Sequence, residues 1–148
     1  AKTVISLTIL AQVAGGCIGT WAVRRMAAGK VLFISSVGLA AIAGAFCHVG
    51  QGQQIQFTLL AVLLGFVWLL ASPFHISLAL RADPAGETAA VIPALQLLGV
   101  ALGPLAASFV VREVDARPAM EVGALFAIAV VVLLAISRGR SAKMVQSV

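Results

Sequence analysis

The chain has 148 residues, of which 61% are hydrophobic and only 10% are charged, and its mean hydropathy is +1.11. Soluble domains are about 45–50% apolar and about 25% charged, and a chain this short keeps much of its surface exposed. This composition excludes an ordinary water-soluble globule, so lipid must be part of the solvent. The net charge of +5 lies in short basic clusters between apolar runs, which is typical of membrane topology and gives no reason to expect a nucleic-acid partner.

Five apolar runs meet or approach the length needed to cross a hydrocarbon core of about 30 Å as helices, since each helical residue adds about 1.5 Å. In chain order they are residues 3–23, 31–49, 55–80, 89–111 and 119–137. The connections are short, so consecutive helices should run antiparallel and pack side by side. The sequence therefore predicts an all-α fold, a polytopic transmembrane bundle of five spanning helices forming one half-domain, with a cytoplasmic tail at residues 138–148.

The orientation of the bundle follows from its basic residues, which are unequally divided between the two sides. The richer side carries Arg24, Arg25, Lys30, Arg81, Arg138, Arg140 and Lys143, whereas the poorer side carries Lys2, Arg112 and Arg117. Because cytoplasmic loops carry the excess of Lys and Arg, we expect an integral protein of the cell (inner) membrane with its N-terminus outside and its C-terminus in the cytoplasm. The chain starts with Ala1 instead of Met, so we expect earlier helices to precede the first crossing.

Three of the five runs carry a polar face with helical spacing. These faces comprise Thr8, Gln12, Gly15 and Gly19 in the first run, Gly65, Trp68, Ser72 and His75 in the third, and Gln96, Gly99 and Gly103 in the fourth. Polar residues that face lipid are costly, so these faces should point into the protein or toward water. We expect these three helices to line a path, and Gln12, Trp68, Ser72 and Gln96 are the candidate residues along it. The second and fifth helices should then lie outside them.

Small residues on these faces also have a simpler interpretation. A Gly-x-x-x-Gly spacing lets two helix backbones approach closely, and it occurs at Gly15–Gly19 and at Gly99–Gly103. We therefore expect Gly15, Gly99 and Gly103, with the neighbouring Pro104, to serve helix packing.

The polar residues have alternatives as well. Gln96 either faces the path or forms a hydrogen bond with a neighbouring helix. His75 is a candidate for proton coupling, since histidine titrates near neutral pH; contact with interfacial water is the more economical interpretation. Cys17 and Cys47 lie inside apolar runs without metal-ligand or redox spacing, so they should behave as small hydrophobic residues.

No enzyme signature is present in the sequence. It contains no paired carboxylates, no metal-ligand cluster and no phosphate-binding loop, and these are the patterns that carry the common chemistries. We therefore expect no enzymatic activity, no metal and no cofactor.

Two segments resemble the major facilitator superfamily of secondary transporters. The first runs from Gly19 through Arg24 and Arg25 to Lys30 and resembles the family's cytoplasmic loop motif, with Val23 at the position of the family's acidic residue. The second includes residues 83–90 and 96–104, in which Asp83, a glycine, a glutamine and Gly-x-x-x-Gly-Pro recur. It resembles the family's loop between helices 10 and 11 and the following helix, although Glu87 stands where an arginine is common.

The resemblance covers nearly the whole chain and corresponds to helices 8 to 12, the C-terminal half of a twelve-helix carrier. It implies a cytoplasmic gate motif at Gly19, Arg24, Arg25 and Lys30. It also implies alternating-access transport of a small solute, with ion coupling, and three partners: the lipid bilayer, the missing N-terminal helices of the same carrier, and the solute with protons as a further candidate. The alternatives are a small noncatalytic membrane protein that acts by helix–helix association as a subunit or scaffold and, least favoured, an intramembrane enzyme.

Overall fold

A computed structural model describes residues 2–50, 52–109, 111 and 117–146, without the side chains of residues 117 and 137–146. The described residues form five α-helices and no strand. In chain order the helices are α1 (Lys2–Ala22), α2 (Ala28–Phe46), α3 (Gln54–Ala82), α4 (Glu87–Ser108) and α5 (Arg117–Gln146). All five are long and apolar enough to cross a membrane, which confirms the predicted all-α class and the predicted number of spans.

The ends of the helices differ from the apolar runs because hydropathy marks the part of a helix that suits lipid, whereas the hydrogen-bond ladder extends beyond it. The helix α2 begins at Ala28, before its apolar run, and ends at Phe46. The helix α5 has its apolar span at Pro118–Ile136 and continues as a helix to Gln146. Most of the predicted tail is therefore helical.

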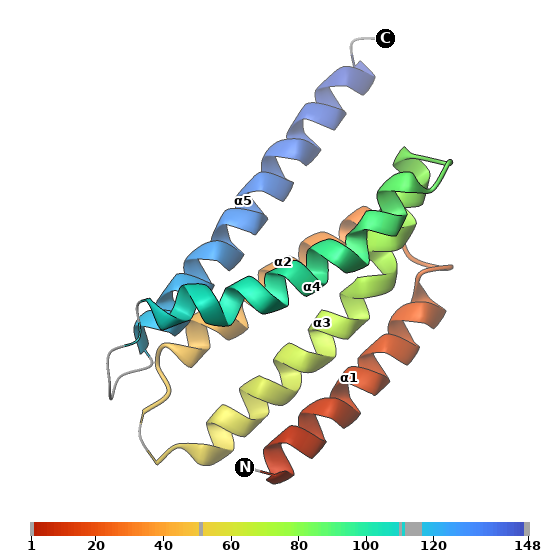
Figure 1. Ribbon diagram of the computed structural model, residues 1–148. Helices are drawn as coiled ribbons and strands as arrows, with labels where there is room; N and C mark the ends of the chain where they lie inside the picture. Colours follow the sequence, from red (N-terminus) through yellow and green to blue (C-terminus); the bar gives the residue numbers. More distant parts are fainter. Residues whose placement is uncertain (1, 51, 110, 112–116, 147–148) are drawn as a thin grey trace.

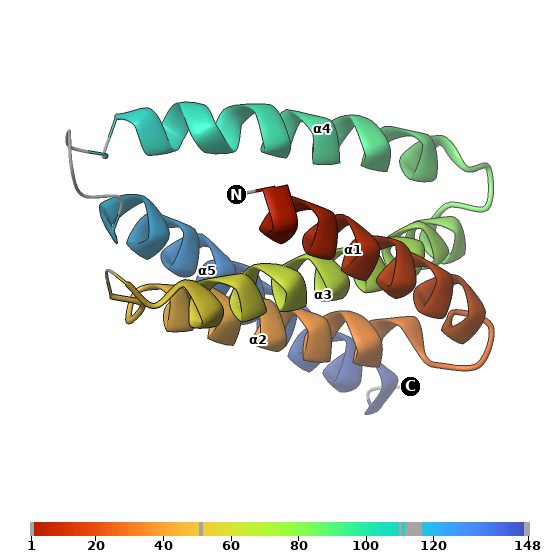
Figure 2. The same cartoon turned by 90° about the horizontal axis from the view of Figure 1, so that it is seen from below.

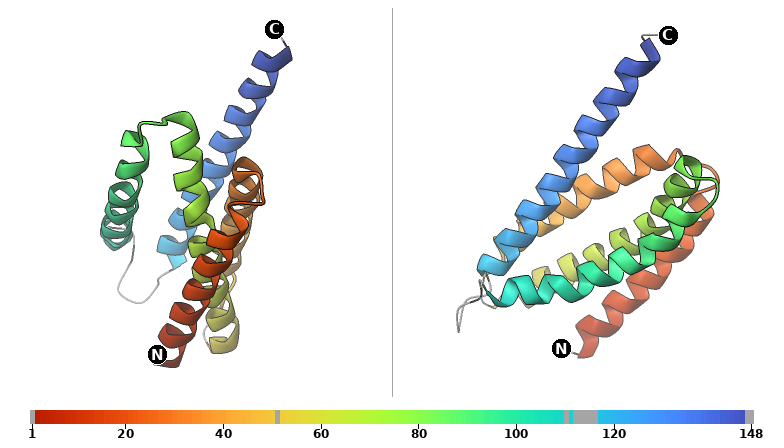
Figure 3. Two further views of the ribbon diagram at one scale, coloured as in Figure 1. Left: turned by 90° about the vertical axis from the view of Figure 1, so that its right-hand side faces the viewer. Right: turned by 45° about the horizontal axis from the view of Figure 1, so that its top comes forward.

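Helices that are consecutive in the chain run antiparallel, so α1 and α3 run parallel, and α3 lies at the centre of the packed part (Figure 1). The most extensive contact joins α1 and α3, while α2 contacts both α3 and α5. The helix α4 makes few contacts with α3 and α5, and it stands apart from the other helices (Figure 2). The start of α1 and the end of α5 lie at opposite ends of the bundle (Figure 3). Among the described residues, α2 and α5 thus lie on the side of α3 away from α4 (Figure 2), outside α1, α3 and α4 as the sequence predicts, and α4 is the most loosely packed helix.

Glycines bring the backbones of α1 and α3 into direct contact. A Cβ atom added to Gly15 would collide with the backbone carbonyl oxygen of Phe66, and one added to Gly19 would lie 2.5 Å from the carbonyl oxygen of Leu70. From the other side, a Cβ on Gly65 would lie 2.9 Å from the Cγ2 atom of Thr8. Only glycine leaves room for such an approach, which maximises van der Waals contact between helices that gain little from the hydrophobic effect in lipid.

The buried core lies near the basic end of the bundle, where α1 ends and α2 begins. Phe74 of α3 is fully buried, and the residues packed with it are Ala22, Ala28, Val31, Leu32 and Ala71. Four of these five neighbours are smaller than leucine, so the large ring of Phe74 fills the space between the three helices. At the opposite end the rings of Phe46 and Phe57 meet edge to face, with centroids 5.5 Å apart. These contacts hold α1, α2 and α3 together as one unit.

The turn between α3 and α4 is organised by Asp83, which ends α3. Its carboxylate accepts hydrogen bonds from the backbone N–H of Ala85 at 3.1 Å and from the backbone N–H and hydroxyl of Thr88 at 2.9 and 3.0 Å. These bonds favour the ionised carboxylate, so the pKa of Asp83 is lowered. Gly86 completes the turn with a φ of +84°, a backbone conformation in which glycine carries no steric penalty. The start of α4 is thereby fixed even though the rest of the helix is loosely packed.

Candidate functional site

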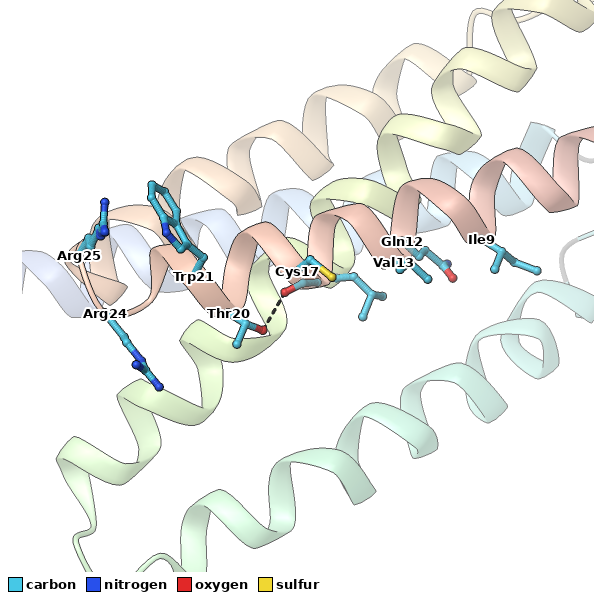
Figure 4. A pocket seen from close by; sticks show the side chains of 10 residues that line it. Ile9, Gln12, Val13, Cys17, Thr20, Trp21, Arg24 and Arg25 are labelled. Atoms are coloured by element: carbon cyan, nitrogen blue, oxygen red, sulfur yellow. Dashed lines mark hydrogen bonds between the residues drawn. The ribbon is translucent and has the colours of Figure 1, made fainter.

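An open groove of about 880 Å³ runs along one side of α1. Its apolar wall is formed by Ile9, Val13, Cys17 and Leu69, the last contributed by α3. Two polar side chains of α1, Gln12 and Thr20, also line it (Figure 4). We call this feature the α1 groove.

One hydroxyl of the α1 groove is satisfied by the protein itself. The hydroxyl of Thr20 donates a hydrogen bond of 2.8 Å to the carbonyl oxygen of Gly16. The Gln12 side chain is half-buried and its Cγ atom lies against Gly65 of α3. Because Gly16 has no side chain, the wall between these two residues stays open.

Two arginines and a tryptophan close one end of the α1 groove. Arg24 and Arg25 follow the last helical residue of α1, and their side chains point to opposite sides of it (Figure 4). The guanidinium carbon of Arg25 lies 4.3 Å from the ring centroid of Trp21, a cation–π contact. Arg24 is exposed and forms no ion pair or side-chain hydrogen bond within the part of the chain that the structure describes. The groove therefore carries positive charge at one end and an apolar wall along its length.

The structure divides the four candidate path residues between two places. Gln12 lies in the α1 groove with Arg24 and Arg25. Trp68 and Ser72 of α3 do not line this groove; Trp68 is 47% exposed and Ser72 is half-buried. Gln96 is half-buried on α4. No described pocket brings Gln12 together with the other three.

The remaining predicted site residues also have defined places. His75 is exposed on the same face of α3 as Trp68 and Ser72, as the spacing of three and four residues requires. Gly19 is buried against α3, whereas Lys30 is exposed in the first turn of α2 and does not line the α1 groove. The basic residues of the gate motif are therefore near one end of the bundle without forming one cluster.

The two Gly-x-x-x-Gly patterns have different surroundings. Gly15 and Gly19 lie against the backbone of α3. A Cβ added to Gly99 or Gly103 of α4 would meet nothing within 4 Å, and Pro104 beside them is exposed. The predicted packing role of the α4 glycines is thus not realised among the described residues.

Sequence reasoning missed several residues of the α1 groove, although a signal for them was present. Gln12, Gly16, Thr20 and Arg24 recur every fourth residue, and Ile9, Val13, Cys17 and Trp21 form the adjacent row. Rows with this spacing share one face of a helix. Polarity alone does not predict this face, because one of its two rows is apolar and the other mixes polar residues with glycine.

Within residues 2–50, 52–109, 111 and 118–136, no three His, Cys, Asp or Glu side chains are grouped closely enough to hold a metal ion.

No family model, curated protein or solved structure matches the chain. Its function must therefore be inferred from the residues and their arrangement.

Proposed function

We propose that the chain is part of a secondary active transporter that moves a small solute across the membrane by alternating access. The observation that carries this proposal is the contrast between α4 and the unit formed by α1, α2 and α3. That unit is held by glycine-mediated backbone contacts and by the Phe74 core, whereas no residue of α4 is buried. A packed unit beside a loosely held helix suits a protein in which one part moves against another.

The composition of α4 supports the same proposal. Pro93 and Pro104 lie inside the helix, and each removes one backbone hydrogen bond and permits a bend. Gln96 lies one turn after Pro93, and an amide within a membrane span needs water or another polar group. Such a helix is stable beside a hydrated path and poorly suited to lipid on all sides.

In this proposal the path runs between Gln96 of α4 and the face of α3 that carries Trp68 and Ser72. Proton coupling through His75 belongs to the same proposal, because His75 shares that face and is exposed. The resemblance to the major facilitator superfamily supports it independently, since it assigns α1 to α5 to helices 8 to 12 of a carrier whose remaining helices would complete the path.

Water access at Gln96 tests this proposal. In a variant whose two cysteines, Cys17 and Cys47, are replaced by alanine, a single cysteine is introduced by Gln96→Cys or, as the matched control, by Leu97→Cys. Leu97 is 70% exposed and points to a different side of α4. The thiolate, which is the reactive form, exists only where water reaches the sulfur. We expect a membrane-impermeant thiol reagent to label the Gln96→Cys variant in intact membranes and not the Leu97→Cys variant.

The opposite labelling result would contradict the proposed hydrated path. If the reagent fails to label the Gln96→Cys variant, or labels both variants equally, α4 does not border water in the way the proposal requires. Ser72→Cys gives a second reading from the other wall of the path, and protection at both Gln96→Cys and Ser72→Cys would contradict the transporter proposal as a whole.

A second candidate function is a subunit or scaffold that acts through helix association, and one observation favours it. No described residue contacts the Gly99–Gly103 face of α4, so this face is free to pack against a helix of another chain. In that case Gln96→Cys would be protected, while Gly99→Cys would form a disulfide-linked product with a partner or a second copy. The transporter proposal predicts labelling at Gln96→Cys without such a product.

A further inference from the structure

We propose that the α1 groove binds one anionic phospholipid, with its phosphate at Arg24 and one acyl chain along the apolar wall. This inference concerns a lipid site and does not depend on the proposed transport function. It rests on two features of the groove: the charge at its end and the length of its apolar wall.

The charge at the end of the groove suits a phosphate. Arg24 lacks an ion-pair partner among the described residues, and a guanidinium presents several N–H donors that match phosphate oxygens. Arg25 is held in place over the ring of Trp21 at 4.3 Å. Both arginines follow the end of a spanning helix, where a membrane-embedded α1 places them at the level of the lipid headgroups. Basic pockets between spanning helices at this level bind anionic headgroups.

The wall of the groove suits an acyl chain. From Ile9 to Trp21 the groove extends about 18 Å, at about 1.5 Å per residue, and one leaflet of the hydrocarbon core is about 15 Å deep. The wall along this length includes Ile9, Val13, Cys17 and Leu69. Thr20 donates its hydroxyl proton to Gly16, so it requires no polar group from an occupant. A single chain can therefore lie along α1 while its headgroup reaches Arg24.

Charge complementarity favours an anionic lipid over the other occupants. An apolar helix in the groove would leave Arg24 without a partner at the headgroup level. A zwitterionic lipid offers the same phosphate, but its cationic amine would lie near the guanidinium of Arg24. A lipid whose only charge is the phosphate, such as phosphatidylglycerol, avoids this repulsion. The groove should consequently prefer phosphatidylglycerol to phosphatidylcholine.

Tryptophan fluorescence tests the site directly, because Trp21 and Trp68 are the only two tryptophans of the chain. Trp21 lines the groove and Trp68 does not. A Trp68→Phe variant reports on the groove, and a Trp21→Phe variant reports on a position outside it. Each variant is reconstituted in vesicles that contain dibrominated phosphatidylglycerol or dibrominated phosphatidylcholine, whose bromines quench a tryptophan in contact with the chain.

The expected result is stronger quenching of Trp21 by the phosphatidylglycerol probe, with no preference at Trp68. Replacing Arg24→Gln in the Trp68→Phe background should lower the relative association constant of phosphatidylglycerol about fivefold. Arg24→Lys keeps a positive charge and should retain most of the preference. The matched control is Lys30→Gln, because Lys30 lies at the same end of the bundle outside the groove, and this variant should keep the full preference.

Three outcomes would overturn the proposal. Equal quenching of Trp21 by the two probes would show that the groove does not select charge. An equal loss of preference in Lys30→Gln and Arg24→Gln would assign the effect to general surface charge. Shielding of Trp21 from both probes would show that another protein segment occupies the groove.

Discussion

Replacing Gly15 with alanine is expected to destabilise the protein by about 1–3 kcal/mol, the usual cost of adding a group to a packed contact. The new Cβ would collide with the backbone carbonyl oxygen of Phe66. A backbone cannot rotate away as a side chain can, so α1 and α3 would have to separate. The measurement is the free energy of unfolding in detergent micelles during titration with a denaturing detergent. Gly19→Ala should act in the same direction, because its Cβ would lie 2.5 Å from the carbonyl oxygen of Leu70.

The matched control for Gly15→Ala is Gly16→Ala, one residue further along the same helix. A Cβ on Gly16 would lie 3.8 Å from the nearest side-chain atom, the Cδ1 of Leu69, which is ordinary van der Waals contact. Both substitutions gain the same helix propensity, about 1 kcal/mol in soluble helices, so the difference between them isolates the contact with α3. Equal stabilities of the two variants would contradict the close approach of α1 and α3.

Truncation of Phe74 to alanine should have an effect of similar or larger size. The ring of Phe74 is fully buried between α1, α2 and α3. In a membrane the unfolded chain also keeps its apolar side chains in lipid, so the loss comes mainly from the cavity. At about 24 cal/mol per Å³ of cavity, we expect a destabilisation of about 2–3 kcal/mol. The same unfolding titration in micelles measures it.

The control for this substitution is Phe126→Ala on α5. Phe126 is 67% exposed, so its truncation leaves no cavity among the described residues and should change the free energy of unfolding little. A Phe74→Ala variant as stable as the Phe126→Ala variant would mean that the three helices do not pack around Phe74.

The sequence predicted which segments span the membrane, but it did not predict which helices contact one another. Whether a run of residues suits lipid depends on that run alone, so all five helices could be recognised. Whether a glycine face meets another helix depends on the position of that helix. Gly15–Gly19 and Gly99–Gly103 have the same spacing, yet only the first pair lies against a backbone.

The same limit applies to the candidate site. Polarity along α1 indicated Gln12, but it could not show that Gln12 shares a groove with Arg24 and lies apart from Gln96. Hydropathy also did not predict where the helices end, since α5 continues to Gln146. The periodicity of the groove face, in contrast, was readable from the sequence once apolar and charged residues were considered together.

The side of the membrane on which each connection lies tests the five spans most directly. In the variant without Cys17 and Cys47, single cysteines are introduced by Met26→Cys, His48→Cys and Ala85→Cys, all at exposed positions between helices. A membrane-impermeant maleimide should label the His48→Cys variant in intact cells, and the other two variants only after the membrane is permeabilised. Labelling of Met26→Cys and His48→Cys from the same side would contradict the five spans, because α2 would then not cross the membrane.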